Sequence, residues 1–366
     1  MRHILYYIFV FFILFNCKGN KHDEQIFDPE FQTDIEKEIP GKVKNDKVEI
    51  IGLLYHRFGD QKYSSTNIST SLFEKHLKYL KENEFQVITL SQALNHLLSK
   101  DVAGRYVVIS IDDGFKSFLE NGFPLLKKYE FNATLFINTE TVGKGDYLNW
   151  DELAFISSNG IEIGNHTHSH AYFLDMDHSK RYNQFKNDVM LSQRIIDEKL
   201  DIQPIVFAYP YGEYDSLMMQ EIKEMGFLGA AAQNSGVISQ FSDIYALPRF
   251  PMTDQYGKME SFEEKLKLKP LPVVHEIPET NVATANPPSL IIQLEEGNYN
   301  LDQGQCFIQG GSCDHFKINS INRTIEIRSG TKLKNRRHLY TITVPDKTGR
   351  EWYWYSHQWI FTNIKE

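Results

Sequence analysis

The feature that most constrains the fold is an alternation of two hydrophobic periodicities along residues 48–231. Near-continuous apolar runs of strand length, such as Val48–Tyr55 and 107–111, are separated by segments whose apolar residues recur at helical spacing. Strands that are buried on both faces by helices are typical of a mostly parallel sheet. About seven such units occur, which favours an α/β fold of the distorted (β/α)7-type barrel over an open sheet.

The other expected elements follow the same alternation. Further strands are expected at 133–137, 161–164, 205–208 and 227–231, and helices at 71–83, 115–129, 150–158, 179–200 and 216–225. In such barrels the catalytic groups lie at the C-terminal ends of the strands. Polar residues directly after the strands are therefore the candidates for a site.

The N-terminus combines a short apolar run with a cysteine. Arg2 and His3 precede an apolar stretch at 4–15, which is shorter than the ~20 residues that span a bilayer but typical of a secretory signal. Cys17 resembles the lipobox cysteine of bacterial lipoproteins. This resemblance implies cleavage of residues 1–16, a lipid on Cys17, and an exported protein anchored to the periplasmic or surface side of a bacterial envelope membrane. An ordinary signal peptide or an uncleaved anchor stays open, since residues 14–16 lack the usual small residue.

Composition divides the rest of the chain. Residues 17–46 are polar without periodicity and are expected to form a tether. The central domain is expected at 47–265, a linker at 266–288, where five of the 13 prolines fall, and an all-β C-terminal domain at 289–366. The formal net charge of −9 argues against a nucleic-acid partner.

Two clusters of metal-ligating residues follow expected strands. Asp112 and Asp113 end the strand at 107–111, and adjacent buried carboxylates are costly unless a metal or hydrogen bonds compensate them. His166, His168 and His170 follow the strand at 161–164. Imidazole is the commonest protein ligand of borderline divalent metals, and His166 and His170 can converge if the loop coils into one turn. His168 is expected to point away or to assist.

Two further strand ends carry weaker signals. The sequence Phe-Ala-Tyr-Pro-Tyr-Gly at 207–212 offers backbone N–H groups suited to an oxyanion hole, or is only a tight turn. His56 ends the first strand, where a lone histidine is more often structural than catalytic. All four clusters fall at strand ends and are therefore expected on the same rim.

Taken together, these residues resemble the polysaccharide deacetylases of the NodB-homology family (carbohydrate esterase family 4), over residues 48–255. The family's first motif appears as Ser-Ile-Asp-Asp-Gly at 110–114, which implies Asp112 as the general base and Asp113 as a metal ligand. The second motif implies His166 and His170 as the other ligands. The third motif implies that the Tyr211 backbone N–H binds the oxyanion.

The sequence departs from the family pattern at two points. Ala208 replaces the arginine that orients the base in the family, and Arg249 is the candidate for taking over that role. The catalytic-acid histidine usually comes last, whereas here His56 precedes Asp112. This order is similar to the permuted branch that deacetylates poly-N-acetylglucosamine, and a barrel tolerates it because its first and last strands are neighbours.

The resemblance implies an enzyme, a metal-dependent hydrolase that acts on carbon–nitrogen bonds other than peptide bonds. It would remove N-acetyl groups from an acetylated polysaccharide containing N-acetylglucosamine, of the poly-N-acetylglucosamine or peptidoglycan type. Zinc is the first expected metal, with Co²⁺, Ni²⁺ or Fe²⁺ open, because a mixed N/O site discriminates poorly. The rival interpretation is a catalytically impaired glycan-binding surface lipoprotein, which the missing arginine favours. A non-haem iron oxygenase and a two-carboxylate glycosidase fit the residue spacing less well.

The C-terminal residues alternate as strands do, for example at 324–328 and 340–344, which indicates a small all-β sandwich. Cys306 and Cys313 flank a Gly-Gly turn and are a candidate disulfide, which an exported compartment permits. Trp352 and Trp354 share one face of an expected strand. We expect that face to lie in the core, with stacking on sugar rings as the alternative.

Overall fold

The computed structural model describes residues 46–99 and 102–365. The expected signal peptide, the expected lipidation site Cys17 and the expected tether up to residue 45 lie outside the described residues. Within those two described ranges, no helix is both long enough and apolar enough to span a membrane.

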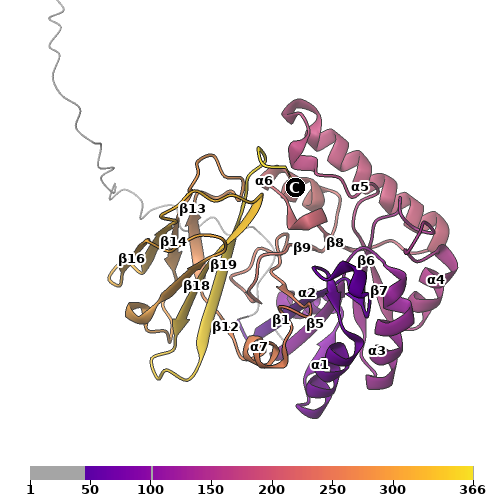
Figure 1. Ribbon diagram of the computed structural model, residues 1–366, viewed down its shortest axis with the longest axis horizontal. Helices are drawn as coiled ribbons and strands as arrows, with labels where there is room; N and C mark the ends of the chain where they lie inside the picture. The colour runs from indigo at the N-terminus through magenta and orange to yellow at the C-terminus, as the bar shows by residue number, and fades with distance from the viewer. Residues whose placement is uncertain (1–45, 100–101, 366) are drawn as a thin grey trace, which may run out of the picture. The chain divides into compact units, whose positions relative to one another are not determined.

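The central domain is built on one nine-stranded sheet (Figure 1). Its strand order is β10-β1-β5-β6-β7-β8-β9, with β11 beside β1 and β4 beside β5. All pairings are parallel except that of β1 with β10. The strands are β1 (Val48–Tyr55), β4 (Gln86–Ile88), β5 (Gly104–Ile111), β6 (Ala133–Ile137), β7 (Ile161–Asn165), β8 (Val206–Ala208), β9 (Gly229–Ala231), β10 (Val237–Ile238) and β11 (Phe250–Pro251). The predicted distorted α/β barrel is confirmed.

The helices cover this sheet and mostly match the expected ranges (Figure 1). They are α1 (Thr70–Glu82), α2 (Leu90–Leu98), α3 (Phe123–Tyr129), α4 (Trp150–Ser158), α5 (His178–Leu200), α6 (Ser216–Glu224) and α7 (Met259–Lys265). The expected helix at 115–129 is divided, because a π-helical turn at Phe118–Gly122 precedes α3. Helix α2 was not expected, although its buried residues recur at helical spacing behind a capping box formed by Thr89 and Gln92.

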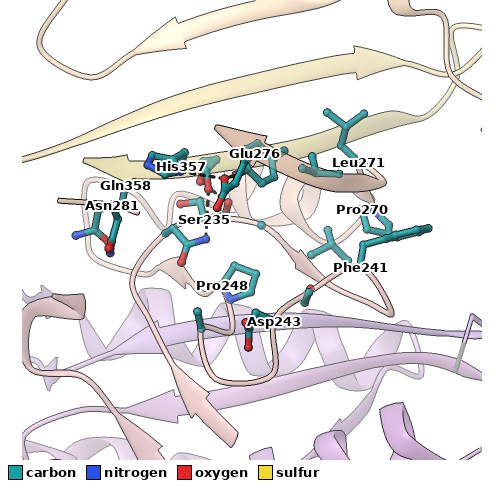
Figure 2. Close-up of a pocket in the computed structure, with 18 of the residues that line it drawn as sticks. Ser235, Phe241, Asp243, Pro248, Pro270, Leu271, Glu276, Asn281, His357 and Gln358 are labelled. Atoms are coloured by element: carbon teal, nitrogen blue, oxygen red, sulfur yellow. Dashed lines mark hydrogen bonds and ion pairs between the residues drawn. The ribbon is translucent and has the colours of Figure 1, made fainter. Parts of the chain in front are cut away.

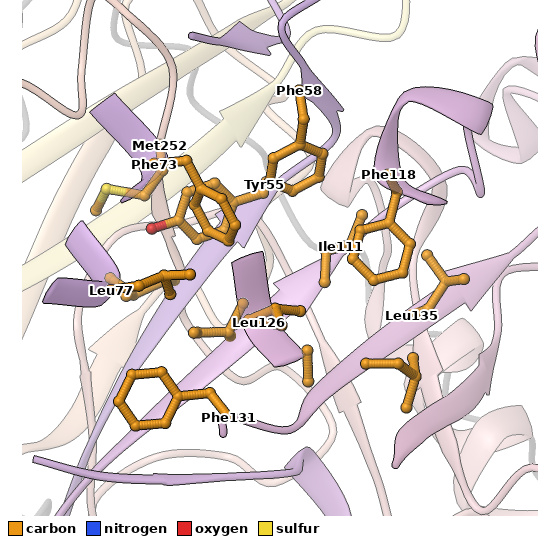
Figure 3. Close-up of a cluster of buried hydrophobic side chains, with 14 of the residues drawn as sticks. Tyr55, Phe58, Phe73, Leu77, Ile111, Phe118, Leu126, Phe131, Leu135 and Met252 are labelled. Atoms are coloured by element: carbon orange, nitrogen blue, oxygen red, sulfur yellow. The ribbon is translucent and has the colours of Figure 1, made fainter. Parts of the chain in front are cut away.

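A large apolar cluster packs the helices against the sheet and fixes β1 beside β5 (Figure 3). Tyr55 and Ile111, the last residues of β1 and β5, are cross-strand partners, and both are fully buried in this cluster. The buried Tyr55 hydroxyl donates to His76 Nδ1 at 3.0 Å. The residues that directly follow these two strands therefore lie side by side, on strand ends that are held in place by close packing.

The C-terminal part forms two four-stranded sheets, which we call the β module. One has the order β12-β19-β18-β15 and the other β13-β14-β17-β16. The strands are β12 (Lys269–Pro270), β13 (Val273–Ile277), β14 (Ser289–Leu294), β15 (Gln305–Ile308), β16 (His315–Asn319), β17 (Thr324–Arg328), β18 (Arg337–Pro345) and β19 (Trp352–Ile360). An all-β arrangement is what the alternation predicts.

The expected linker at 266–288 does not only connect the two parts. It contributes β12 and β13, one to each sheet of the β module. The prolines do not prevent this, because β12 is an edge strand, where Pro270 can lie without interrupting a ladder, and β13 contains no proline. Residues 269–270 and 273–277 of the expected linker are therefore strands of the β module.

The aromatic residues of β19 point in the opposite directions to those expected, because the tyrosines and not the tryptophans face the core of the β module. Tyr353 and Tyr355 pack against the core of the β module. Trp354 instead packs on the barrel, with its ring 5.9 Å from that of Phe250, and its Nε1 donates to Ser235 O at 3.1 Å. Trp352 remains 36% exposed. Alternation predicts that a strand has two faces, but both faces of β19 meet protein.

Cys306 and Cys313 are joined by a disulfide, with their Cα atoms 6.1 Å apart. The bridge closes the turn that contains Gly310 and Gly311, beyond the end of β15.

Candidate active site and metal centre

The first part of the site is the end of β5. The Asp112 N–H donates to Tyr55 O at 3.0 Å, so Asp112 prolongs the pairing with β1. Asp113 and Gly114 both adopt φ +75°, in the left-handed region, which turns the chain sharply away from the strand. This turn separates the directions of the two carboxylates.

The second part is the histidine loop after β7. Thr167 and His170 adopt left-handed conformations, with φ +69° and +52°. Asp188 Oδ1, on α5, accepts from the His168 N–H at 2.7 Å and the Ser169 N–H at 3.0 Å. These contacts coil the loop, so that the imidazoles of His166 and His170 converge.

The two imidazoles meet the Asp113 carboxylate. His166 Nε2 lies 3.6 Å and His170 Nε2 3.3 Å from Asp113 Oδ1, and donor atoms of the three residues all lie within 4.8 Å of one another. His166 Nδ1 donates to Ala208 O at 2.7 Å, which leaves the Nε2 lone pair directed at the cluster. Burial alone would raise the pKa of Asp113, but the adjacent imidazoles lower it by more than burial raises it. The pKa of Asp113 therefore lies well below its ordinary value. An ionised carboxylate and two imidazoles fit a divalent metal.

Asp112 is held by Arg249. Arg249 Nη1 donates to Asp112 Oδ1 at 2.7 Å and Nη2 donates to Oδ2 at 2.8 Å, and both side chains are fully buried. Arg249 also donates from Nε to Ala232 O at 2.9 Å, which fixes its plane. Burial raises the pKa of Asp112, but the Arg249 guanidinium, together with the His166 and His56 imidazoles, more than offsets this and keeps the pKa below its ordinary value.

His56 reaches the same rim from the first strand. It directly follows Tyr55, the cross-strand partner of Ile111, so His56 and Asp112 leave their strands side by side. Its imidazole is close enough to Asp113 and Asp112 to lower the pKa of both carboxyl groups. The position of His56 is therefore compatible with the permuted order.

The loop after β8 carries Tyr211. Tyr211 has φ +59° within the 3₁₀ turn Pro210–Gly212, a conformation that costs a non-glycine residue of order 1–3 kcal/mol. Its ring packs edge-on against His170, with centroids 4.5 Å apart, and stacks on Tyr172 at 3.9 Å. The loop that the sequence places at the oxyanion position thus lies directly beside a candidate metal ligand.

Several contacts of the site were not expected from the sequence. His168 Nδ1 is 2.8 Å from Thr139 Oγ1, so its imidazole contacts the loop after β6 and is not one of the clustered donors. Asp188 lies in the middle of the predicted long helix, where a charged residue gave no signal. Arg336, from the β module, binds Glu213 in the loop after β8. The two are separated by 123 residues, and no motif connects them.

A cavity of about 450 Å³ lies between the barrel and the β module (Figure 2). Ser235 and Pro248 line it from the barrel, and Glu276 and His357 from the β module. None of the three clustered metal donors lines it. The candidate active site is therefore a separate feature, at the rim of the barrel.

Comparison with known proteins agrees with this geometry. Residues 99–230 match the model of the polysaccharide deacetylase family. The matched range contains Asp112, Asp113, His166, His170 and Tyr211. His56 and Arg249 lie outside it, on either side.

Individual relatives cover about three fifths of this chain. The chain is 26% identical over 258 residues to the poly-β-1,6-N-acetyl-D-glucosamine N-deacetylase of Staphylococcus aureus, covering 62% of this chain and 85% of that protein. The deacetylase PplD of Streptococcus pyogenes, solved with acetate, superposes with a TM-score of 0.54 at 20% identity, covering 62% of this chain and 99% of that one. IcaB from Ammonifex degensii gives a TM-score of 0.53 at 21% identity, with the same coverage. These superpositions show a barrel of the NodB type.

Proposed function

We propose that this chain, a homologue of the polysaccharide N-deacetylases of carbohydrate esterase family 4, is a metal-dependent hydrolase that removes N-acetyl groups from an N-acetylglucosamine polymer. The observation that carries the proposal is the convergence of the Asp113, His166 and His170 donor atoms beside the Asp112–Arg249 pair. Metal donors and an ionised, oriented carboxylate are the two parts that amide hydrolysis needs.

The metal would be held by Asp113, His166 and His170. Zn²⁺ is the first choice for two imidazoles and one carboxylate, with Co²⁺, Ni²⁺ and Fe²⁺ also compatible. When bound, such an ion polarises an acetamide carbonyl and lowers the pKa of a coordinated water. The hydrogen bond from His166 Nδ1 to Ala208 O supports this role, because it fixes the tautomer that a ligand requires.

Asp112 would act as the general base. Its pKa lies below the ordinary value, so the carboxylate is ionised at neutral pH and can accept a proton from the attacking water. Arg249 occupies one acceptor site on each carboxylate oxygen and leaves the remaining lone pairs. Arg249 would therefore orient the base, in place of the arginine that the family carries where Ala208 stands.

The loop after β8 and His56 would complete the reaction. The water oxygen bonds to the acetamide carbon, and the Tyr211 backbone N–H stabilises the resulting oxyanion. As the C–N bond breaks, the protonated His56 donates to the departing nitrogen. The products are acetate and a sugar with a free amine.

We propose poly-β-1,6-N-acetylglucosamine as the first substrate to test, with peptidoglycan-type polymers second. The similarity to the Staphylococcus aureus enzyme over 62% of this chain supports this order. The position of His56 before Asp112 supports it as well. The Asp112–Arg249 pair weighs against a glycan-binding protein without activity, because it supplies what the substitution at Ala208 removes.

The test is acetate release from β-1,6-linked N-acetylglucosamine oligomers by the zinc-loaded full chain. Asp112→Asn should retain the metal and lose turnover, whereas His166→Ala should lose both. His168→Ala is the matched control from the same loop, and it should retain both. Normal turnover in Asp112→Asn, or tight metal binding in His166→Ala, would contradict the assignment.

We also propose that the chain is exported and anchored in a bacterial envelope membrane by a lipid on Cys17. The support is the apolar stretch at 4–15, which is followed by Asn16 and then by this cysteine. Cells expressing the full chain with an alkyne-tagged fatty acid should incorporate label into the wild type and not into Cys17→Ser. Equal label in both proteins would exclude lipidation at this residue.

A further inference from the structure

One arginine of the β module binds two loops of the candidate active site. Arg336 directly precedes β18 and is 1% exposed. Its Nε donates to Glu213 Oε1 at 2.7 Å and its Nη2 to Glu213 Oε2 at 2.8 Å. The same Nη2 lies 2.7 Å from Asp175 Oδ1, and Nη1 donates to Ile364 O at 3.0 Å.

The two acidic partners belong to the two loops that carry site residues. Glu213 follows Tyr211 by two positions, in the loop after β8. Asp175 follows His170 by five positions, in the loop after β7. A single guanidinium therefore ties the loop proposed to bind the oxyanion to the loop that carries two candidate metal ligands.

Ring contacts reinforce this connection. The Arg336 guanidinium lies 4.9 Å from the centroid of the Tyr172 ring, and Tyr172 stacks on Tyr211. Arg337, the first residue of β18, places its guanidinium 5.4 Å from the Tyr211 ring and donates to Glu213 Oε1 at 3.1 Å. Two consecutive arginines of the β module thus contact the Tyr211 loop at its ring and at Glu213.

The burial of this cluster indicates more than an incidental surface pair. Glu213 is only 4% exposed, and an unpaired carboxylate at such a position costs several kcal/mol. The bidentate geometry supplies two charge-assisted hydrogen bonds in fixed directions. It can therefore hold the left-handed conformation of Tyr211, which its surroundings must maintain.

We infer that the β module is part of the catalytic unit, and that Arg336 is a positioning residue that sets the Tyr211 loop relative to the metal-ligand loop through Glu213 and Asp175. This inference rests on the proposed deacetylase function. It gives the β module a role, although the family match at residues 99–230 ends before it. Loss of the Arg336 contact should displace the oxyanion donor while the metal donors stay in place.

The test compares Arg336→Lys and the double variant Arg336→Gln/Glu213→Gln with wild type in the full chain. Lysine keeps the positive charge but cannot donate the two parallel hydrogen bonds of a guanidinium. The double variant removes the charges of Arg336 and Glu213 together. Both variants are therefore expected to fold. We expect kcat to fall roughly 10–100-fold, by comparison with the ~10²–10³-fold that loss of an oxyanion donor costs. KM should stay within about threefold and the zinc content should be unchanged. Arg328→Gln, which alters an exposed arginine of the same module, is the matched control and should behave as wild type.

Wild-type kcat in both folded variants would overturn the inference, as would a loss of zinc that accounts for the loss of kcat. A second readout separates this inference from the proposed function. Amide hydrogen exchange of the peptide covering 209–214 should be at least tenfold faster in Arg336→Lys than in wild type, whether or not the wild type releases acetate. Unchanged exchange in that peptide would overturn the inference. An inactive wild type with faster exchange in the variant would instead count against deacetylation alone.

Discussion

Arg249 donates two parallel hydrogen bonds to Asp112, at 2.7 and 2.8 Å, although the two residues are 137 positions apart in the sequence. Arg249 directly precedes β11, which pairs in parallel with β1, while Asp112 directly follows β5 on the other side of β1. The pair therefore spans the first strand, and His56 leaves that strand beside Asp112. An arginine at the start of a different strand thus binds Asp112, the proposed base, which in the family pattern is oriented by the arginine that Ala208 replaces here.

Arg249→Lys tests this relationship. Lysine keeps the positive charge but cannot donate to both carboxylate oxygens in one plane, so Asp112 should remain ionised and lose its fixed orientation. We expect kcat for acetate release to fall roughly 10–100-fold with the zinc content unchanged. Arg249→Ala should in addition lower the free energy of unfolding by about 3–5 kcal/mol, because it leaves a buried carboxylate unpaired. Full activity in a folded Arg249→Lys protein would remove Arg249 from the mechanism.

The barrel could be predicted because its strands are apolar on both faces and its helices are not. The cluster of candidate metal donors could be predicted for a related reason, since Asp113, His166 and His170 each follow such a strand within a short motif. Arg249 was a candidate only because this sequence has Ala208 where the family pattern has an arginine. The contacts of Arg336 were not predictable, because a buried ion pair between residues 123 positions apart leaves no local pattern. The edge strand β12 was missed since proline breaks most strands but not those at an edge.

His56 is proposed to protonate the leaving nitrogen, and the leaving group provides a direct test. His56→Ala should slow acetate release from N-acetylglucosamine oligomers by roughly 10²–10⁴-fold, the usual range for loss of general acid catalysis. Hydrolysis of an aryl acetate should slow far less, since a phenolate departs without a proton. Both rates are measured on the same zinc-loaded preparations. An equal loss on the two substrates would mean that His56 has another role.

The buried His76 should make the stability depend on pH. Burial lowers the pKa of His76 to about 4, from 6.5 in the unfolded chain. In the folded protein, neutral His76 accepts from the Tyr55 hydroxyl, donates to Gly257 O and stacks on Phe262. Below pH 6.5 the unfolded chain binds a proton that the folded protein does not bind until about pH 4, so stability falls as the pH falls. The expected loss between pH 8 and pH 5 is about 2 kcal/mol.

Urea unfolding at pH 8 and pH 5 measures this dependence, with His76→Gln as the comparison. Glutamine does not titrate, so the variant should be less stable at pH 8 but should lose about 2 kcal/mol less than wild type on going to pH 5. Other groups contribute equally to both proteins and cancel in the difference. Identical pH dependence in the two proteins would show that His76 is protonated as readily when folded as when unfolded.

Asp188 should control metal affinity without being a ligand. Its Oδ1 accepts both the His168 and the Ser169 N–H groups, and these lie between the candidate ligands His166 and His170. Asp188→Ala removes the acceptor that coils this loop, so we expect zinc affinity to fall roughly 10–100-fold, as is usual when a group supporting metal ligands is lost. Asp188→Asn retains a carbonyl acceptor and should lose much less. Competition with a fluorescent zinc chelator measures the affinities, and Asp197→Ala, on the same helix, is the control.

At saturating zinc, kcat of Asp188→Ala should approach the wild-type value, because the loop regains its conformation when the ligands are bound. A kcat that stays low at saturation would place Asp188 in the chemistry of the site.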